Sequence, residues 1–246
     1  MNWQEIYKNK LVTADEAVKR IKSEDKVVFS HCVSEPTALV DAMVDNASCY
    51  KNVEISHMFS LGEGRYCNEE YKDNFHPNLW FLSGQTRKCV EEGRGEFTPL
   101  FFHEVPKLMR NGTISVDVAL IMVTPPNEYG KVSTGVAGDY TVQAVKSAKT
   151  VIAQVNSEVP YTFGDAEFSV DEIDYFVEKN QPLPTLPEAR IGEIEEKIGK
   201  NCAELIEDGD TLQLGIGAIP DAVCHQLKHK KNLGIHSEML GDGVVE

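Results

Sequence analysis

The sequence predicts an α/β protein in which a parallel or mixed sheet is covered by helices. Short apolar strands alternate with amphipathic helices in the first half of the chain, which is typical of β-α-β units. Residues 116–123, VDVALIMV, are apolar almost throughout, as expected of a central parallel strand that is buried on both faces. A third pattern, described below, predicts the start of a second, similar α/β/α domain near residue 191.

The composition excludes several classes of protein. The net charge of -15, from 39 acidic and 24 basic residues, argues against binding to nucleic acid or to an anionic membrane. No apolar run reaches the roughly 18 residues of a membrane span, and the N-terminus lacks the apolar core of a signal peptide. The six cysteines have no CxxC spacing and the histidines form no HExxH motif, which indicates a cytoplasmic protein with free thiols and no metal site.

Helices and strands alternate over the first 64 residues. We expect helices over residues 13–23 and 36–50 and strands over residues 25–31 and 53–59. Thr13 and Glu16 form a capping-box pattern at the start of the first helix, and Pro36 suits the first turn of the next. A glycine turn at residues 61–64 follows the second strand.

The middle of the chain gives a less regular pattern. We expect strands over residues 78–83, 116–123 and 150–156, and a strand continuing as a short helix over 101–112. Residues 125–135 predict a loop, or a loop with a short extended piece, and residues 139–149 a helix. Pro106 suits the start of the short helix, and Gly112 suits its end. Residues 159–178 mix extended and helical signals.

A proline-rich segment predicts a domain boundary. Three prolines fall within residues 182–187, where neither a helix nor a central strand would tolerate them. We therefore expect an N-terminal α/β domain over residues 1–181, a linker over 182–190 and the beginning of a second α/β domain over 191–246. In that second part the pattern predicts a helix over residues 191–206, a strand and glycine turn over 211–219, a helix from Pro220 to residue 231 and a strand over 234–238.

The second part repeats the element order of the first, offset by about 185 residues. Helix, acidic turn, strand, loop, proline-started helix and strand recur in the same order around Asp25 and Asp210. Too few residues follow Asp210 for a complete second copy. We therefore expect the sequence to be the N-terminal part of a longer protein, or to be completed by a separate C-terminal segment.

The glycine turn of the second part is the first candidate for chemistry. Its residues are Gly215, Ile216, Gly217, Ala218 and Ile219. Glycines between a parallel strand and a helix let a ligand approach the backbone, and the unpaired amides of the helix start can bind phosphate or stabilise an oxyanion. The GxGxxP spacing differs from the dinucleotide motif GxGxxG, so a tight turn that binds no ligand remains an alternative.

Glu238 is the second candidate. A carboxylate at the carboxyl end of a parallel strand lies where open α/β sheets place their ligand crevices, and it can act as a nucleophile or a general base. His236 would share its strand face, since side chains alternate along a strand. An ordinary surface glutamate is the alternative. We expect the rim of the site to include Gln213, His31, His57 and Met58, while each histidine alone also fits a purely structural role.

These segments resemble the acetyl-CoA hydrolase/transferase family of class I CoA-transferases. The pair GIGAIP and GIHSEM is the most specific part of the resemblance, which extends over essentially the whole chain. The resemblance implies transfer of coenzyme A between an acyl-CoA and a short carboxylic acid of the 4-hydroxybutyrate, butyrate or acetate class. Hydrolysis of acyl-CoA, or an inactive fragment that lacks the rest of the site, are the alternatives.

The resemblance also implies roles for the candidate residues. Glu238 would attack the acyl-CoA thioester and then carry coenzyme A as a glutamyl thioester, which gives ping-pong kinetics. Residues 215–219 match the coenzyme A loop, and Gln213 is placed to hydrogen-bond the reacting carboxylate. Coenzyme A enters as a substrate, so we expect no permanently bound cofactor and no metal. The family resemblance further implies a homodimer of the full-length protein.

Overall fold

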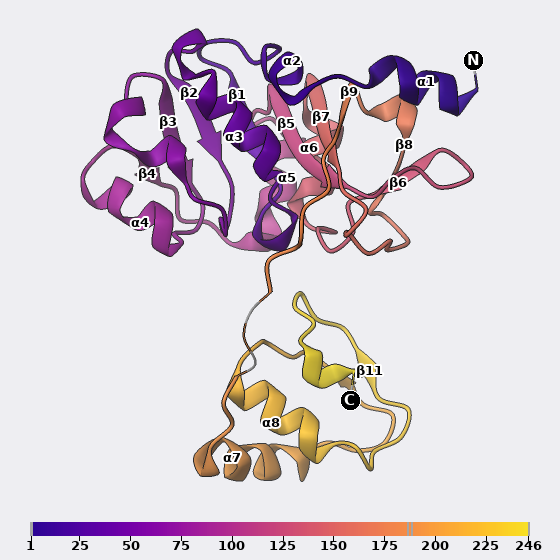
Figure 1. Cartoon of the computed structure of the whole chain (residues 1–246). Helices are drawn as coiled ribbons and strands as arrows, with labels where there is room; N and C mark the ends of the chain where they lie inside the picture. Colours follow the sequence, from indigo (N-terminus) through magenta and orange to yellow (C-terminus); the bar gives the residue numbers. More distant parts are fainter. Residues whose placement is uncertain (1, 186, 188, 246) are drawn as a thin grey trace. The chain divides into compact units, whose positions relative to one another are not determined.

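A seven-stranded parallel sheet forms the centre of the first part of the chain, in the order β4-β3-β2-β1-β5-β7-β9 (Figure 1). Its strands are β1 (Lys26–Phe29), β2 (Val53–Ser56), β3 (Phe75–Leu79), β4 (Glu96–Phe97), β5 (Val118–Val123), β7 (Thr150–Val155) and β9 (Tyr175–Glu178). All of the pairings in this sheet are parallel. Every residue of β5 is buried, as the apolar run predicted. The predicted α/β class is therefore confirmed, with the parallel form of the sheet.

Helices cover both faces of this sheet. They are α1 (Trp3–Lys10), α2 (Ala14–Val18), α3 (Thr37–Asp45), α4 (Gly84–Glu91), α5 (Val105–Arg110) and α6 (Tyr140–Ser147). Alternate strand residues face opposite ways. Phe29 and Leu120 pack in one core cluster with residues of α2 and α3, whereas Val28 and Ile121 pack in a second cluster with residues of α5 and α6. This arrangement makes three layers, helices on either side of the sheet.

The computed structural model describes residues 2–185, 187 and 189–245, and the chain divides into two compact units, Met1–Pro184 and Thr185–Glu246. The division falls within the predicted linker, whose positions 186 and 188 lie outside the described residues. A short antiparallel pair, β6 (Lys131–Ser133) with β8 (Glu167–Ser169), adjoins the first sheet's loops. Among the described residues, no helix is both long and apolar enough to cross a membrane.

Short 3-10 turns complete the first unit and end the second: η1 (Cys32–Ser34), η2 (Ala47–Cys49), η3 (Arg65–Cys67), η4 (Glu69–Tyr71), η5 (Phe102–Glu104), η6 (Val170–Glu172) and η7 (Asp242–Val244). The capping box at Thr13 and Glu16 forms as predicted, but α2 ends at Val18 instead of extending to residue 23. The chain tightens directly after Val18, where the Arg20 and Ile21 amides donate to the Ala17 and Val18 carbonyls three residues back instead of continuing the α-helical pattern. The helix predicted over 36–50 likewise ends at Asp45.

Two predictions in the middle of the chain were wrong. The strand expected before Pro106 is instead η5, because the chain already turns back at Phe101, whose carbonyl accepts a hydrogen bond from the Glu104 amide at 2.9 Å. The strand expected over 78–83 lies earlier, at Phe75–Leu79, and α4 and β4 were not predicted. The capping pair of Ser83 and Thr86 starts α4 and was the missed sequence signal.

The second unit contains α7 (Glu193–Ala203), β10 (Thr211–Leu212), α8 (Ala218–Gln226) and β11 (Gly234–Ile235). β10 and β11 pair in parallel, and the small core between the helices and strands includes Ala203, Val223 and Leu227. The strand predicted over 234–238 was too long, since β11 ends at Ile235. His236 and Glu238 therefore lie in the loop after β11, and the strand alternation expected of them does not apply.

The two units share their opening architecture down to single hydrogen bonds. Four backbone amides in each unit bond to equivalent partners. In the first unit, the Lys22 amide donates to the Asp25 carboxylate, Glu24 to the Lys51 carbonyl, Lys51 to the Ser23 side chain and Glu54 to the Asp25 carbonyl. In the second, the Glu207 amide donates to the Asp210 carboxylate, Gly209 to the Lys231 carbonyl, Lys231 to the Asp208 side chain and Gly234 to the Asp210 carbonyl. The strand register is also the same, with Lys26 opposite Glu54 and Thr211 opposite Gly234. Counting on from these pairs, Gly217 corresponds to Cys32 and Glu238 to Met58.

Candidate functional site

The carboxyl end of β1 presents a partly buried ion pair. His31 follows this strand, and its Nε2 lies 2.9 Å from Oδ2 of Asp139, the N-cap residue of α6. The Thr141 amide donates to the other oxygen of Asp139 at 2.8 Å, which holds the carboxylate in place. Burial disfavours the charged ring, but the hydrogen bond and charge of Asp139, helped by Cys32, raise the pKa of His31 to about 9. His31 is therefore an imidazolium at neutral pH.

His57, at the end of the neighbouring strand β2, has the opposite character. It is fully buried, stacks on Phe29 with 4.5 Å between ring centroids, and shares a 2.7 Å hydrogen bond between Nε2 and the Tyr66 hydroxyl. Burial, and then the charge of His31, lower the pKa of His57 to about 3, so the ring is neutral. The structure thus places His57 in the interior of the first unit and not on an exposed rim.

Tyr140 connects the ends of these two strands. Its hydroxyl donates to the Phe29 carbonyl at 2.7 Å and accepts from the Met58 amide at 3.4 Å. Its ring also lies against His31, with 5.2 Å between centroids. Met58 is itself 9% exposed, so it too is largely interior. Of the predicted rim residues in this unit, the structure brings His31 and Met58 together at Tyr140, while His57 lies against Phe29 and Tyr66. Only His31 is partly exposed.

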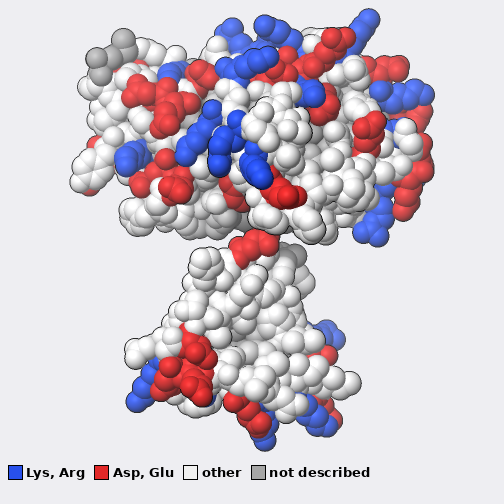
Figure 2. Space-filling view, turned by 180° about the vertical axis from the view of Figure 1, so that it is seen from behind, with Lys and Arg blue, Asp and Glu red and all other residues white. Residues whose placement is uncertain are grey.

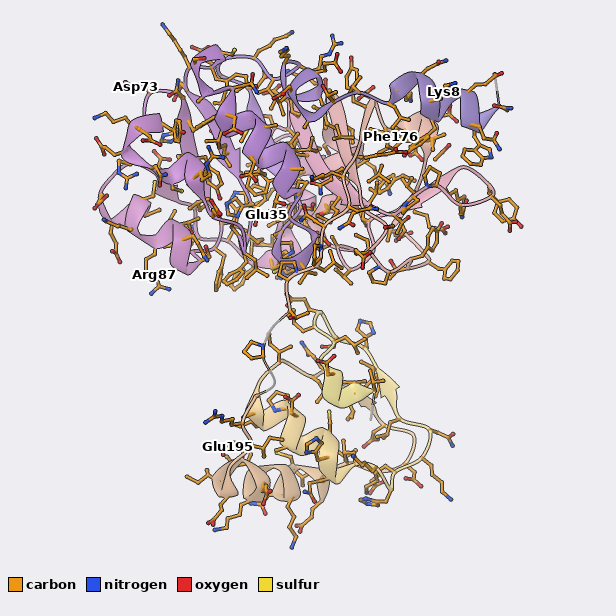
Figure 3. All side chains as sticks on the ribbon, in the orientation of Figure 1. Lys8, Glu35, Asp73, Arg87, Phe176 and Glu195 are labelled. Carbon is orange, nitrogen blue, oxygen red and sulfur yellow. The ribbon has the colours of Figure 1, made fainter. Side chains whose placement is uncertain are left out.

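Glu35 is a buried acid that sequence reasoning missed. It lies just before α3, at the edge of the sheet where β1 ends (Figure 3). One of its oxygens accepts hydrogen bonds from the Ser60 hydroxyl at 2.8 Å and from the Leu61 and Gly62 amides at 2.9 Å each. Burial raises the pKa of Glu35, and these three donors oppose that rise. The sequence signal was slight, a single acid between a serine and a helix-starting proline.

The glycine turn of the second unit joins β10 to α8. Gly217 has a φ of 119°, a backbone conformation that residues with a Cβ rarely adopt, and it caps α8. The helix begins at Ala218, so Ala218 and Ile219 belong to its first turn and Pro220 is its third residue instead of its start. The amides of a first turn have no acceptor within the helix, which leaves this end able to bind an anion.

Ser237 ties this turn to the segment that carries Glu238. The Ser237 hydroxyl donates to the Leu214 carbonyl at 2.6 Å and accepts from the Leu214 amide at 3.2 Å, and the His236 amide donates to the Leu212 carbonyl at 2.9 Å. The structure therefore brings the glycine turn and Glu238 to the same end of the β10–β11 pair. Both Glu238 and Gln213 are exposed. A carboxylate nucleophile beside backbone amides suits attack on a carbonyl carbon followed by stabilisation of an oxyanion.

Surface charge is mixed on one face of the protein. On the face seen in Figure 2, Lys and Arg side chains lie among Asp and Glu side chains in both units. An anionic ligand would therefore depend on local amides and dipoles more than on a broad basic surface there. Among the residues that the structure describes, no cluster of three or more His, Cys, Asp or Glu side chains could hold a metal ion.

Comparison with known sequences identifies the family that this chain resembles. Residues 1–187 match the family model described as the acetyl-CoA hydrolase/transferase N-terminal domain. The whole chain is 53% identical over 246 residues to the 4-hydroxybutyrate coenzyme A transferase of Clostridium kluyveri, of which it covers 57%. It is 38% identical to the succinyl-CoA:cyclohexane-1-carboxylate CoA transferase of Geobacter metallireducens, of which it covers 56%. The chain thus spans little more than half the length of these relatives.

Solved structures also match this chain over almost all of its length. The crystal structure of a 4-hydroxybutyrate CoA-transferase from Porphyromonas gingivalis matches with a TM-score of 0.87 and 38% identity, over 99% of this chain and 58% of the other. RipA from Yersinia pestis matches with a TM-score of 0.94 and 30% identity, over 100% of this chain and 59% of the other.

Proposed function

The chain belongs to the acetyl-CoA hydrolase/transferase family, and we propose that it supplies the nucleophile of a coenzyme A transferase for short carboxylic acids. The position of Glu238 carries the proposal, because Ser237 holds it next to the glycine turn at residues 215–219. The names of the relatives, one of which is a butyryl-CoA:acetate CoA-transferase from Anaerostipes caccae, support the class of substrate. We propose acids of the 4-hydroxybutyrate, butyrate or acetate class.

In this mechanism the Glu238 carboxylate attacks the thioester carbonyl of an acyl-CoA. The C–S bond breaks, the coenzyme A thiolate leaves, and an acyl-glutamyl anhydride remains. The thiolate then attacks the glutamyl carbonyl, which releases the first carboxylate and forms a glutamyl-CoA thioester. The incoming acid reverses these steps and leaves as the new acyl-CoA. Two displacements of similar energy replace one difficult exchange, and the kinetics should be ping-pong.

The glycine turn and its helix have a supporting role in the proposal. Amides of Gly217, Ala218 and Ile219 would face the oxyanion of each tetrahedral intermediate or the coenzyme A chain, and Gln213 would hydrogen-bond the reacting carboxylate. Coenzyme A arrives and leaves as a substrate, so the scheme requires no resident cofactor. The proposal includes a homodimer and a location in the cytoplasm. The six free cysteines favour the cytoplasm because it is a reducing compartment.

Trapping the intermediate tests the proposal. We would join residues 1–246 to the part of the Clostridium kluyveri relative that lies beyond the match, incubate the hybrid with butyryl-CoA, and reduce it with borohydride. Intact and peptide mass spectrometry should show modification at Glu238, and labelled acetate should exchange into acyl-CoA. Glu238→Gln should lower the exchange rate by about 10³-fold or more. Glu204→Gln, another exposed glutamate of the second unit, should leave it unchanged.

Two results would contradict the transferase proposal. A folded hybrid without exchange activity would be one, and a Glu238→Gln hybrid with the wild-type exchange rate would be the other. Because the family description also names a hydrolase, release of free coenzyme A should be measured in the same reactions. Release without exchange would favour acyl-CoA hydrolysis, in which water attacks the glutamyl thioester.

A further inference from the structure

Cys32 lies at the end of a chain of three side chains in the first unit. Its Sγ is 3.4 Å from His31 Nδ1, and the other ring nitrogen of His31 is 2.9 Å from Asp139 Oδ2. One imidazole therefore joins a thiol to a carboxylate. A nucleophile within hydrogen-bond reach of a histidine that a third group orients is the arrangement that activates cysteines in proteins. The glutamyl mechanism proposed above uses none of these three side chains.

The backbone holds Cys32 firmly in this place. Its φ of 52° is left-handed, which is uncommon for a residue with a Cβ, and the equivalent position in the second unit is Gly217. The Cys32 amide donates to the Phe59 carbonyl at 2.8 Å, which fixes the turn against the loop after β2. Cys32 is a partly exposed residue, so a small reagent can approach it. Cys67 and Cys89, in contrast, are buried.

The groups around the ring favour its charged form. Asp139 faces it from α6, Tyr140 lies against it from the same helix, and Phe102 of η5 packs edge-on with 5.5 Å between centroids. From β2, His57 is neutral and places no competing charge there, as its pKa of about 3 indicates. With both ring nitrogens protonated, Nδ1–H is the donor toward the Cys32 sulfur 3.4 Å away, and Nε2–H is the donor toward Asp139.

We propose that Cys32 is a reactive thiol and a site of modification by low-molecular-weight disulfides. The Cys32 thiolate attacks one sulfur of the disulfide RSSR, a new S–S bond forms between protein and R, and the old S–S bond breaks. The leaving thiolate takes a proton from solvent, which replaces the proton that Cys32 lost. Overall, a protein thiol and a disulfide become a mixed disulfide and a free thiol. The inference does not depend on the transferase proposal.

Rates of modification at individual cysteines test this inference on the whole chain. The native protein would be treated at pH 7 with limiting 2,2′-dithiodipyridine, digested, and analysed by mass spectrometry for each cysteine. We expect Cys32 to react about tenfold faster than Cys49, although Cys49 is the more exposed thiol. Cys32→Ser should remove the fast phase of thiopyridone release.

Substitution of the histidine separates the effect of the ring from that of exposure. His31→Gln and Asp139→Asn should each bring the rate at Cys32 close to that at Cys49, whereas His103→Gln, at an exposed histidine, should not. Circular dichroism would establish that each variant is folded. A wild-type Cys32 that reacts no faster than Cys49 would overturn the proposal without any variant, and so would an unchanged rate in folded His31→Gln.

Discussion

Two histidines at adjacent strand ends show how far local contacts determine charge. His31 and His57 follow neighbouring parallel strands, yet the pKa of one rises to about 9 and that of the other falls to about 3. A carboxylate 2.9 Å away accounts for the first, and complete burial without an acidic partner accounts for the second. Their positions in the sequence predicted proximity to a sheet edge, but Asp139, more than 100 residues distant, could not be paired with His31 from spacing alone.

The His31–Asp139 pair predicts a pH-dependent contribution to stability. Because the folded pKa of His31 lies above its ordinary value of 6.5, its contribution is fully present below pH 6.5 and is lost as the pH rises through 9. His31→Gln should lower the free energy of unfolding by about 2–3 kcal/mol near pH 6.5 and by much less near pH 10. Urea unfolding of both proteins between pH 6 and 10 measures this; a difference that does not change with pH would contradict the assignment.

Glu35 predicts a steric requirement at Gly62. A Cβ added to Gly62 would lie 2.4 Å from Oε1 of Glu35, which three hydrogen bonds to its other oxygen hold in place. Gly62→Ala should therefore destabilise the first unit by about 1–3 kcal/mol. Gly84→Ala is the matched control, because nothing lies within 4 Å of its Cβ position at the start of α4, and it should be neutral or slightly stabilising. Urea unfolding followed by tryptophan fluorescence measures both, and equal stabilities would contradict the prediction.

At the scale of single elements, local patterns predicted some segments well and others poorly. The apolar run of β5, the capping box at Thr13 and the amphipathic pattern of α7 were recognisable because burial, capping and periodicity act within a few residues. The end of α2 was not, since the Arg20 and Ile21 amides bond to carbonyls three residues back in a stretch whose apolar residues keep a helical spacing. β4, with two exposed residues, is defined by its pairing to β3 and has little signal of its own. The start of β11 was predicted, but its early end at Ile235 was not.

Close packing of α7 on α8 gives a prediction at this scale. A Cβ at Gly199 would lie 2.6 Å from the Ala222 carbonyl oxygen and 2.7 Å from its carbon, both of them backbone atoms of α8. Gly199→Ala should force the helices apart in spite of alanine's better helix propensity, at a cost of about 1–3 kcal/mol. Asn201→Ala, at an exposed position of α7, should be neutral or stabilising. Amide hydrogen exchange in α7 and α8 should be faster only in the first variant, and unchanged protection there would show that the helices have room to adjust.

At the scale of the molecule, the internal repeat explains why the second unit could be partly read from the first. Residue spacing alone predicted the repeat, and the shared hydrogen bonds and strand register extend it to atomic detail. The candidate site was only partly predictable. The glycine turn and Glu238 stood out by pattern, but the Ser237–Leu214 bonds that bring them together depend on pairing between segments 23 residues apart.

The repeat also predicts that equivalent substitutions have equivalent effects in the two units. Asn52 and Asn232 precede β2 and β11 and have left-handed φ values of 52° and 58°. Asparagine tolerates this conformation better than residues such as alanine, and glycine tolerates it fully. Asn52→Ala and Asn232→Ala should therefore each cost about 1 kcal/mol, in the first and second unit respectively, while the two glycine variants should cost little.

Two local readouts separate the units in this experiment. Trp3 and Trp80 lie in the first unit, so their fluorescence in urea reports on Asn52→Ala, and exchange of the Gly234 and His236 amides, which donate to Asp210 and Leu212, reports on Asn232→Ala. Each alanine variant should destabilise its own unit and leave the other unchanged. A large effect of one substitution and no effect of the other would contradict the prediction. The two turns would then share a backbone conformation but contribute differently to stability, because surrounding contacts compensate for the strain in only one of them.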